Sequence, residues 1–302
     1  MNKKDIAASS IGDFINNLPL SAAQIKYFYS RVQISYGTDP KNVALRMMEH
    51  YAAPSHNSDS EVDGYYRIAS GNMSVAQSIA GRLEDIRFDH EVRLVEYHEK
   101  KIIVRGTSEG EPFQVVVDGL VLAVPVKILA QIAFSPRLPF PIQNAIASIS
   151  MGTAAKFAVE TGEEPALRAY HDVETPYWCW TGNGANGNVR RVLTAFSGSA
   201  KSLKELGTES NNPAIWFQKI KSVNQDLDFT GDPLMVDWSQ DKWAGGCYSA
   251  FSNQAADNIS GLTKSVGNLF FAGEHTAYNS ATMDGAIESG LRAANQVREQ
   301  LR

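Results

Sequence analysis

The stretch that decides the fold reads Asn268-Leu-Phe-Phe-Ala-Gly-Glu-His-Thr276 and continues, after a polar loop, as Met283-Asp-Gly-Ala-Ile-Glu-Ser-Gly290. Its apolar start predicts a short buried strand over Leu269 to Ala272, followed by a turn at Gly273. The second part predicts a helix that begins at Met283. A helix start presents unpaired N–H groups and the positive end of its dipole, which suits an electron-rich ligand. The stretch therefore predicts a ligand-cradling strand, loop and helix, although a plain amphipathic terminal helix has the same periodicity.

The residues of this stretch resemble a known family. Phe271-Ala-Gly-Glu-His-Thr276, Met283-Asp-Gly-Ala286 and Ser289-Gly-Leu-Arg-Ala-Ala294 are similar to the C-terminal flavin-binding signature of the flavin-containing amine oxidases, which include monoamine, polyamine and L-amino-acid oxidases. The resemblance implies FAD as the cofactor, with Glu274 meeting its ribityl or pyrophosphate part. Gly285 lacks a Cβ and is expected to let the backbone approach a flat ring. The cofactor-binding residues implied within this signature are Gly273, Glu274, Thr282, Met283 and Ala286.

A second segment supports the same resemblance. Asp237-Trp-Ser-Gln-Asp-Lys-Trp-Ala-Gly-Gly-Cys-Tyr248 is similar to the monoamine oxidase segment in which a tryptophan precedes a Gly-Gly-Cys-Tyr turn. The resemblance implies catalytic roles for Trp238 and Tyr248, cofactor contact by Trp238, and one wall of an aromatic cage at Tyr248. Cys247 becomes a candidate for covalent flavin attachment, although an inert buried cysteine is the alternative and non-covalent binding is favoured. Where monoamine oxidases carry the second cage tyrosine, this chain has Thr282.

A third match lies in the middle of the chain. Val121-Leu-Ala-Val-Pro125 and Met151-Gly-Thr-Ala-Ala-Lys156 resemble the family's strand, proline turn and Gly-x-x-x-Lys segment. The resemblance implies a catalytic role for Lys156, which would hold a water near the flavin N5. Its apolar neighbours predict that the strand buries this lysine, and the alternative is a lysine whose head snorkels to water. The resemblance also implies that Val92 contacts the adenine, with plain core packing as the alternative.

The opening part of the family pattern is missing. The strand, Gly-x-Gly-x-x-Gly turn and helix that hold the pyrophosphate do not occur, and Gly182-Asn-Gly184 predicts only a turn. The resemblance implies that about the first third of a complete enzyme is absent. Three explanations stay open: a split enzyme whose second polypeptide carries the Gly-x-Gly-x-x-Gly segment, a fragment of a longer single-chain oxidase, and a catalytically inactive scaffold or regulatory subunit. The retained Lys156, Trp238 and Glu274 favour the split enzyme.

The resemblance implies an α/β fold in two parts. Residues 64–125 and 230–302 would form a discontinuous FAD-binding domain that a partner chain completes. Residues 1–63, a helical segment, and residues 126–229 would form a substrate domain of antiparallel sheet and helices.

Periodicity adds a coarse element order. It predicts helices at Ala22 to Ser30 and Val43 to Tyr51, a polar loop over 53–63, strands from Ile86 to Val124 with a hairpin turn at Glu109 to Pro112, helices over 126–150, strands over 151–200 and helices over 201–225.

Composition excludes several other classes of function. The net charge is −5 and mixed along the chain, with no basic tract, so no nucleic-acid partner is expected. No apolar run is long enough to span a bilayer and the N-terminus lacks a signal-peptide core, which predicts a cytoplasmic protein without a membrane partner. Cys179 and Cys247 are too few for a disulfide framework, and neither has metal-ligand spacing, so no metal is expected.

The implied reaction oxidises the C–N bond of an amine or L-amino acid to an imine, with O2 as the final electron acceptor and H2O2 as its product. Trp178 is a candidate for an aromatic substrate pocket, although aromatic clusters are more often core. Tyr248 and Thr282 are the other predicted substrate-binding residues. An amino acid is slightly preferred because the cage suited to neutral amines is incomplete, although the carboxylate-binding arginine of many relatives comes from the missing portion.

Overall fold

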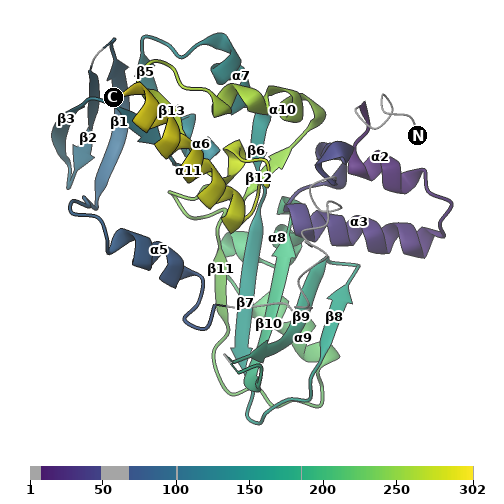
Figure 1. The fold of residues 1–302 in the computed structure, drawn as a ribbon. Coiled ribbons are helices and arrows are strands. Elements are labelled where there is room, and N and C mark those ends of the chain that lie inside the picture. Colours follow the sequence, from purple (N-terminus) through teal and green to yellow (C-terminus); the bar gives the residue numbers. More distant parts are fainter. Residues whose placement is uncertain (1–7, 49–67, 100, 185, 302) are drawn as a thin grey trace, which may run out of the picture.

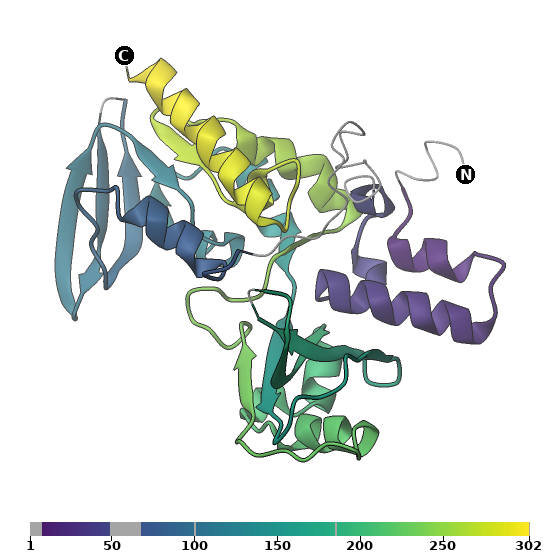
Figure 2. The ribbon, with the colours of Figure 1, turned by 60° about the horizontal axis from the view of Figure 1, so that its bottom comes forward.

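The structure is a computed structural model that describes residues 8–48, 68–99, 101–184 and 186–301. It is a mixed α/β chain with a four-stranded sheet, a five-stranded sheet and two strand pairs (Figure 1). The five-stranded sheet lies apart from the four-stranded sheet and the C-terminal helix, and the N-terminal helices lie to one side in both views (Figure 2). Among the described residues, no helix combines the length and the apolar character that a membrane span requires.

The N-terminal region is helical. Helix α3 starts at a capping box formed by Ser21 and Gln24 and ends at Gly37, whose φ of 64° is the left-handed conformation that glycine adopts readily. It extends beyond the predicted Ala22 to Ser30. The predicted helix from Val43 is a short 3-10 turn in the described residues, and the polar loop predicted at 53–63 lies outside them. The elements are α2 (Ile11–Asn16), α3 (Ala22–Tyr36), η1 (Pro40–Asn42) and η2 (Leu45–Met48).

The four-stranded sheet has the order β3-β2-β1-β5. The predicted hairpin is confirmed, because β2 and β3 are antiparallel and turn at Glu109 and Gly110. Helix α5 (Met73–Ala80), which precedes the sheet, has no buried residue. Strand β5 follows the predicted domain limit at residue 126 but pairs with β1, so the pairing crosses that limit. The strands are β1 (His90–Tyr97), β2 (Ile102–Ser108), β3 (Glu111–Val117) and β5 (Ala133–Ser135).

The five-stranded sheet is antiparallel throughout, with the order β11-β7-β10-β9-β8. One face packs on α8 (Ala200–Glu205) and α9 (Ala214–Val223) around a buried core that includes Trp216. Strand β11 joins this sheet although it follows the predicted limit at residue 230. The strands are β7 (Ala154–Glu160), β8 (Ala169–Asp172), β9 (Tyr177–Asn183), β10 (Val189–Gly198) and β11 (Leu234–Asp237).

A parallel strand pair and the C-terminal helix form the remaining framework. Strand β4 (Leu120–Leu122) pairs with β13 (Leu269–Phe271), and α11 (Met283–Gln300) follows, so the predicted final strand and helix are confirmed. The antiparallel pair β6 and β12 links this region to the start of β7. The other elements are α6 (Val126–Leu129), α7 (Phe140–Ser148), β6 (Ile149–Met151), η3 (Thr208–Ser210), β12 (Ser249–Phe251), α10 (Asn253–Asn258), η4 (Ile259–Thr263) and η5 (Glu274–Thr276).

Candidate functional site

The site begins where the parallel strands β4 and β13 end at the same edge. Gly273 follows β13 with a φ of 122°, and a Cβ there would lie 2.5 Å from the His275 ring. Its N–H donates to Ser289 Oγ of α11 at 2.9 Å. A side chain is therefore excluded at this turn, and the strand end is bound directly to the C-terminal helix.

The start of α11 is capped by Thr282. Its hydroxyl accepts from the Gly285 N–H at 2.9 Å and donates to the Asn279 carbonyl at 2.6 Å. Met283 and Ala286 are exposed on the first turn. Gly285 is buried, and a Cβ there would lie 2.1 Å from the Asn279 carbonyl oxygen, so its approach to a flat ring stays a prediction. Glycine is needed here because the preceding loop folds against the helix, which the linear sequence does not reveal.

Glu274 connects the strand end to two other segments. Its carboxylate accepts hydrogen bonds from the Ser249 N–H at 3.0 Å, the Ser249 hydroxyl at 2.6 Å and the Ala281 N–H at 2.7 Å. A carboxylate offers about four acceptor positions, so these three bonds nearly saturate it. The side chain thus holds β12 and the loop before α11, and its contact with a cofactor stays a prediction.

The segment from Trp238 to Tyr248 lies along the start of β7. The Trp238 N–H donates to the Ala154 carbonyl at 3.2 Å, and the Cys247 N–H donates to the Gly152 carbonyl at 2.8 Å. The Tyr248 hydroxyl donates to the Ser35 carbonyl, at the end of α3, at 2.7 Å. Backbone bonds therefore bring three predicted site residues beside the strand that carries Lys156.

The thiol of Cys247 points into the protein. Its Sγ lies 2.9 Å from the position that a Cβ on Gly37 would take and 3.1 Å from that of a Cβ on Gly152. Burial raises the pKa of this thiol to about 12, and burial also raises that of Cys179 to about 11. Since the thiolate is the reactive form, this surrounding disfavours nucleophilic chemistry at either sulfur.

Lys156 lies on the open face of the five-stranded sheet. The expectation that the strand buries it is wrong, because β7 alternates: Ala155 and Phe157 face the core while Lys156 is exposed. The run of small apolar neighbours hides this alternation in the sequence. Strand pairing aligns one row of side chains across this face: Val236, Lys156, Phe196, Trp178 and His171.

This row places Lys156 and Trp178 on the same face of the sheet. They lie two strands apart, which is about 10 Å at the usual spacing of strands. Phe196 lies between them and stacks on Trp178 with ring centroids 6.2 Å apart. At the far end, the Arg31 guanidinium of α3 lies 5.5 Å from the Trp178 ring centroid. Sequence reasoning missed Phe196, Arg31 and His171. The strand register could have found Phe196 and His171, whereas Arg31 reaches Trp178 only through the packing of α3 on the sheet.

Val92 lines a cavity of about 620 Å³ between β1 and the carboxyl end of β4. Val124, Ile128 and Trp243 line it as well. The predicted adenine contact therefore lies in a hollow that begins where the parallel strands end, the usual position of ligands in α/β sheets. Whether an adenine occupies it stays a prediction.

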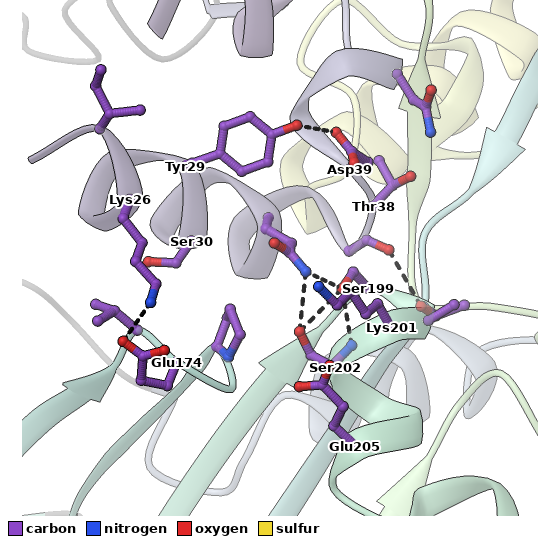
Figure 3. Close-up of a pocket in the computed structure, with 18 of the residues that line it drawn as sticks. Lys26, Tyr29, Ser30, Thr38, Asp39, Glu174, Ser199, Lys201, Ser202 and Glu205 are labelled. Carbon is purple, nitrogen blue, oxygen red and sulfur yellow. Dashed lines mark hydrogen bonds and ion pairs between the residues drawn. The ribbon is translucent and has the colours of Figure 1, made fainter. Parts of the chain in front are cut away.

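A separate cavity of about 770 Å³ lies between α3, η1 and the start of α8 (Figure 3). Its walls include the ion pair of Lys26 with Glu174 and the hydrogen bond from the Tyr29 hydroxyl to Asp39. Burial, followed by the contact with Asp39, raises the Tyr29 pKa. None of the predicted site residues lines this cavity, so it is distinct from the site at the strand ends. Within the described ranges, no group of three or more acidic, histidine or cysteine residues could hold a metal ion.

The strand ends, the capped helix start and the separate five-stranded antiparallel sheet define a mixed α/β protein. The chain belongs to the family described as flavin containing amine oxidoreductase, whose pattern matches residues 4–298.

Relatives support this membership over most of the chain. Nicotine dehydrogenase of Pseudomonas putida is 23% identical over 99% of this chain, which spans 61% of that protein. Polyamine oxidase 3 of Oryza sativa subsp. japonica is 28% identical over 91% of this chain, which spans 56% of it. The structure of cyclohexylamine oxidase from Brevibacterium oxydans superposes with a TM-score of 0.81 at 19% identity, covering 98% of this chain and 68% of that one. The fold is therefore shared, and this chain spans roughly three fifths of the two relatives' length.

Proposed function

We propose that this chain is the substrate-binding subunit of a split FAD-dependent oxidase that acts on amines or L-amino acids. The observation that carries the proposal is the hydrogen-bonded framework in which Glu274 joins the end of β13 to β12 and to the loop before the Thr282 helix start. The exposed Lys156 on β7 supports it as a second predicted site residue. Family membership supports flavin as the cofactor. Bound FAD would supply the electron-accepting ring.

The residues present fit the ring side of such a cofactor. The first turn of α11 is exposed at Met283 and Ala286, so its N-terminal dipole is accessible to an electron-rich ring. The Val92 cavity lies at the end of the same parallel strands and would take the adenine. We propose non-covalent binding, because the half-buried Cys247 thiol packs against Gly37 and Gly152 and its pKa is raised to about 12.

The chain's own residues would position the substrate rather than perform acid–base chemistry. Lys156 would hold a water beside the reacting atoms, and Trp238 and Tyr248 would shape the pocket. The cationic ammonium of Lys156 favours a neutral over a protonated amine nearby, and the neutral amine is the form that can give up electrons. In the overall reaction the substrate loses two electrons and two protons to form an imine, and O2 takes up both to form H2O2.

The exposed surface of α11 supports the proposal of a partner chain. Met283, Ile287 and Leu291 are 43%, 46% and 64% exposed and recur at i, i+4 and i+8, so they form one apolar stripe. Helix α5 also exposes Met73 and Ile79 and buries no residue. Apolar faces of this kind mark contact surfaces. We propose that a second polypeptide with the Gly-x-Gly-x-x-Gly segment covers the α11 stripe.

The visible spectrum of the chain purified with its native partner tests the proposal. Flavin absorbance at about 450 nm in a complex with a second chain supports it, and colour that stays in the supernatant after acid precipitation supports non-covalent binding. We expect Lys156→Met to slow flavin reduction or reoxidation, whereas Lys204→Met on the exposed side of α8 leaves both unchanged. A colourless complex would instead favour the inactive scaffold. Steady-state assays with amino acids and their decarboxylated amines separate the two substrate classes.

A further inference from the structure

The far end of the open sheet face carries a guanidinium whose position the amine chemistry does not explain. Arg31 is exposed on α3, and its Cζ lies 5.5 Å from the centroid of Trp178, within the range of a cation–π contact. Trp178 belongs to the row that contains Lys156. The aromatic rings of Phe196 and Trp178 therefore lie between the Lys156 ammonium on β7 and the Arg31 guanidinium on α3.

Arg31 has no acidic partner among the described residues. Two acidic side chains of β8 and its turn have other partners: Asp172 Oδ1 accepts the N–H groups of Glu174 and Thr175 at 2.9 and 3.0 Å, and Glu174 pairs with Lys26. His171 adds no negative charge. Burial, followed by the charge of Arg31, lowers its pKa, so at neutral pH its ring is uncharged. The guanidinium fork is thus available to an anion from outside the chain.

We propose that Arg31 is a specificity-determining residue that binds a carboxylate at the end of the substrate remote from the reacting amine. This inference rests on the proposed function, which places the amine at the Lys156 end of the row. In an α-amino acid the amine and the carboxylate share one carbon, so both would lie near Lys156 and neither would reach Arg31. A substrate that spans about 10 Å of the row has its carboxylate several bonds from its amine. The substrate class is therefore ω-amino carboxylates.

The aromatic part of the row suits such a molecule. Phe196 and Trp178 are half-buried and offer their apolar rings between the two cations, where the methylene chain of an ω-amino carboxylate would lie. A neutral amine of the same length would gain the apolar contact without the ion pair. The difference between these two ligands isolates the contribution of Arg31.

The test compares 6-aminohexanoate with hexylamine, which has the same carbon chain without the carboxylate. Both are titrated against the complex as purified, with tryptophan fluorescence as the readout and with Trp178→Phe identifying the signal of Trp178. We expect Arg31→Met to weaken binding of 6-aminohexanoate by about tenfold or more, as for loss of a charge-assisted hydrogen bond, and to leave hexylamine binding unchanged. Arg31→Lys, which keeps the charge without the fork, should lie between them.

Lys204→Met is the matched control, because it removes one positive charge at an exposed residue of α8 for which no ion pair is found among the described residues. It should change neither titration. Equal weakening of both ligands by Arg31→Met, or failure of the wild type to prefer 6-aminohexanoate, would overturn the inference. The flavin spectrum of the same samples keeps the two proposals distinct. If the ligand binds in an Arg31-dependent way but the samples contain no flavin, only the oxidase proposal is contradicted. If flavin is present but Arg31→Met weakens both ligands equally, only the role of Arg31 is contradicted.

Discussion

The five-stranded antiparallel sheet and the parallel pair β4–β13 differ in how completely the described residues enclose them. The antiparallel sheet has its own core, in which Trp216, Phe157 and Tyr177 are almost fully buried between one sheet face and two helices. The parallel pair has only two strands, whereas parallel sheets usually contain more strands and have both faces covered. Its neighbouring helix α11 leaves Leu291 64% exposed. The half that carries the flavin signature is thus the half that the described residues leave open.

The largest expected effect is in the enclosed half. Trp216→Ala removes a fully buried ring that packs against Phe157 and Tyr177, so we expect the free energy of unfolding to fall by about 3–5 kcal/mol. Urea denaturation measures this change. Trp243→Ala, at a residue that is 51% exposed, is the control and should cost less than about 1 kcal/mol. Similar losses in both variants would mean that the antiparallel half does not hold the more stable core.

A pH-dependent effect is expected at the end of β13. Burial lowers the pKa of His275 from 6.5 to about 4. As the pH falls below 6.5 the unfolded chain takes up this proton before the folded chain does, so stability present above pH 6.5 is lost as the pH falls towards 4. At pH 4.5 the loss from this group is roughly 2–3 kcal/mol. His275→Gln should remove this part of the pH dependence, and thermal unfolding at pH 7 and pH 4.5 measures it. An unchanged pH profile would contradict the buried neutral state.

A smaller loss is expected where Glu274 joins the parallel pair to β12. Glu274→Gln places an amide donor among the N–H groups of Ser249 and Ala281, so we expect a loss of about 1–3 kcal/mol. Glu288→Gln, at an exposed residue that accepts one N–H from Tyr278, is the control and should change stability little. Chemical denaturation of both variants measures the difference. If Glu274→Gln is as stable as the wild type, the carboxylate does not stabilise this framework. That result would favour a role of Glu274 in cofactor binding.

The smallest effect on the chain itself is expected on the α11 stripe. Leu291→Asp should change the free energy of unfolding by less than about 0.5 kcal/mol because Leu291 is exposed, yet it should weaken assembly with the proposed partner by about tenfold or more. Val223→Asp, at an exposed apolar residue in the enclosed half, should affect neither quantity. Size-exclusion chromatography and titration of the two chains measure assembly. Unimpaired assembly of Leu291→Asp would move the contact surface away from α11.

Local sequence patterns predicted which helices and strands form better than they predicted which of these elements pair in space. The helix from Ala22, the hairpin at Glu109 and the final strand and helix follow from periodicity, caps and turn residues, all of which act over a few positions. The predicted limits at residues 126 and 230 were drawn along the chain, whereas β5 and β11 pair across them. Strand pairing is a long-range choice, so element order alone does not reveal it.

The sequence by itself determined the family and most of the secondary structure, because signature residues and periodicity are local properties of the chain. Only the tertiary structure decided that Lys156 is exposed, that Gly285 packs against Asn279, and that Glu274 bonds to Ser249. It also decided the row that leads from Lys156 past Trp178 to Arg31. These contacts join residues from distant segments, and strand register and close backbone approach, rather than sequence spacing, set which side chains meet.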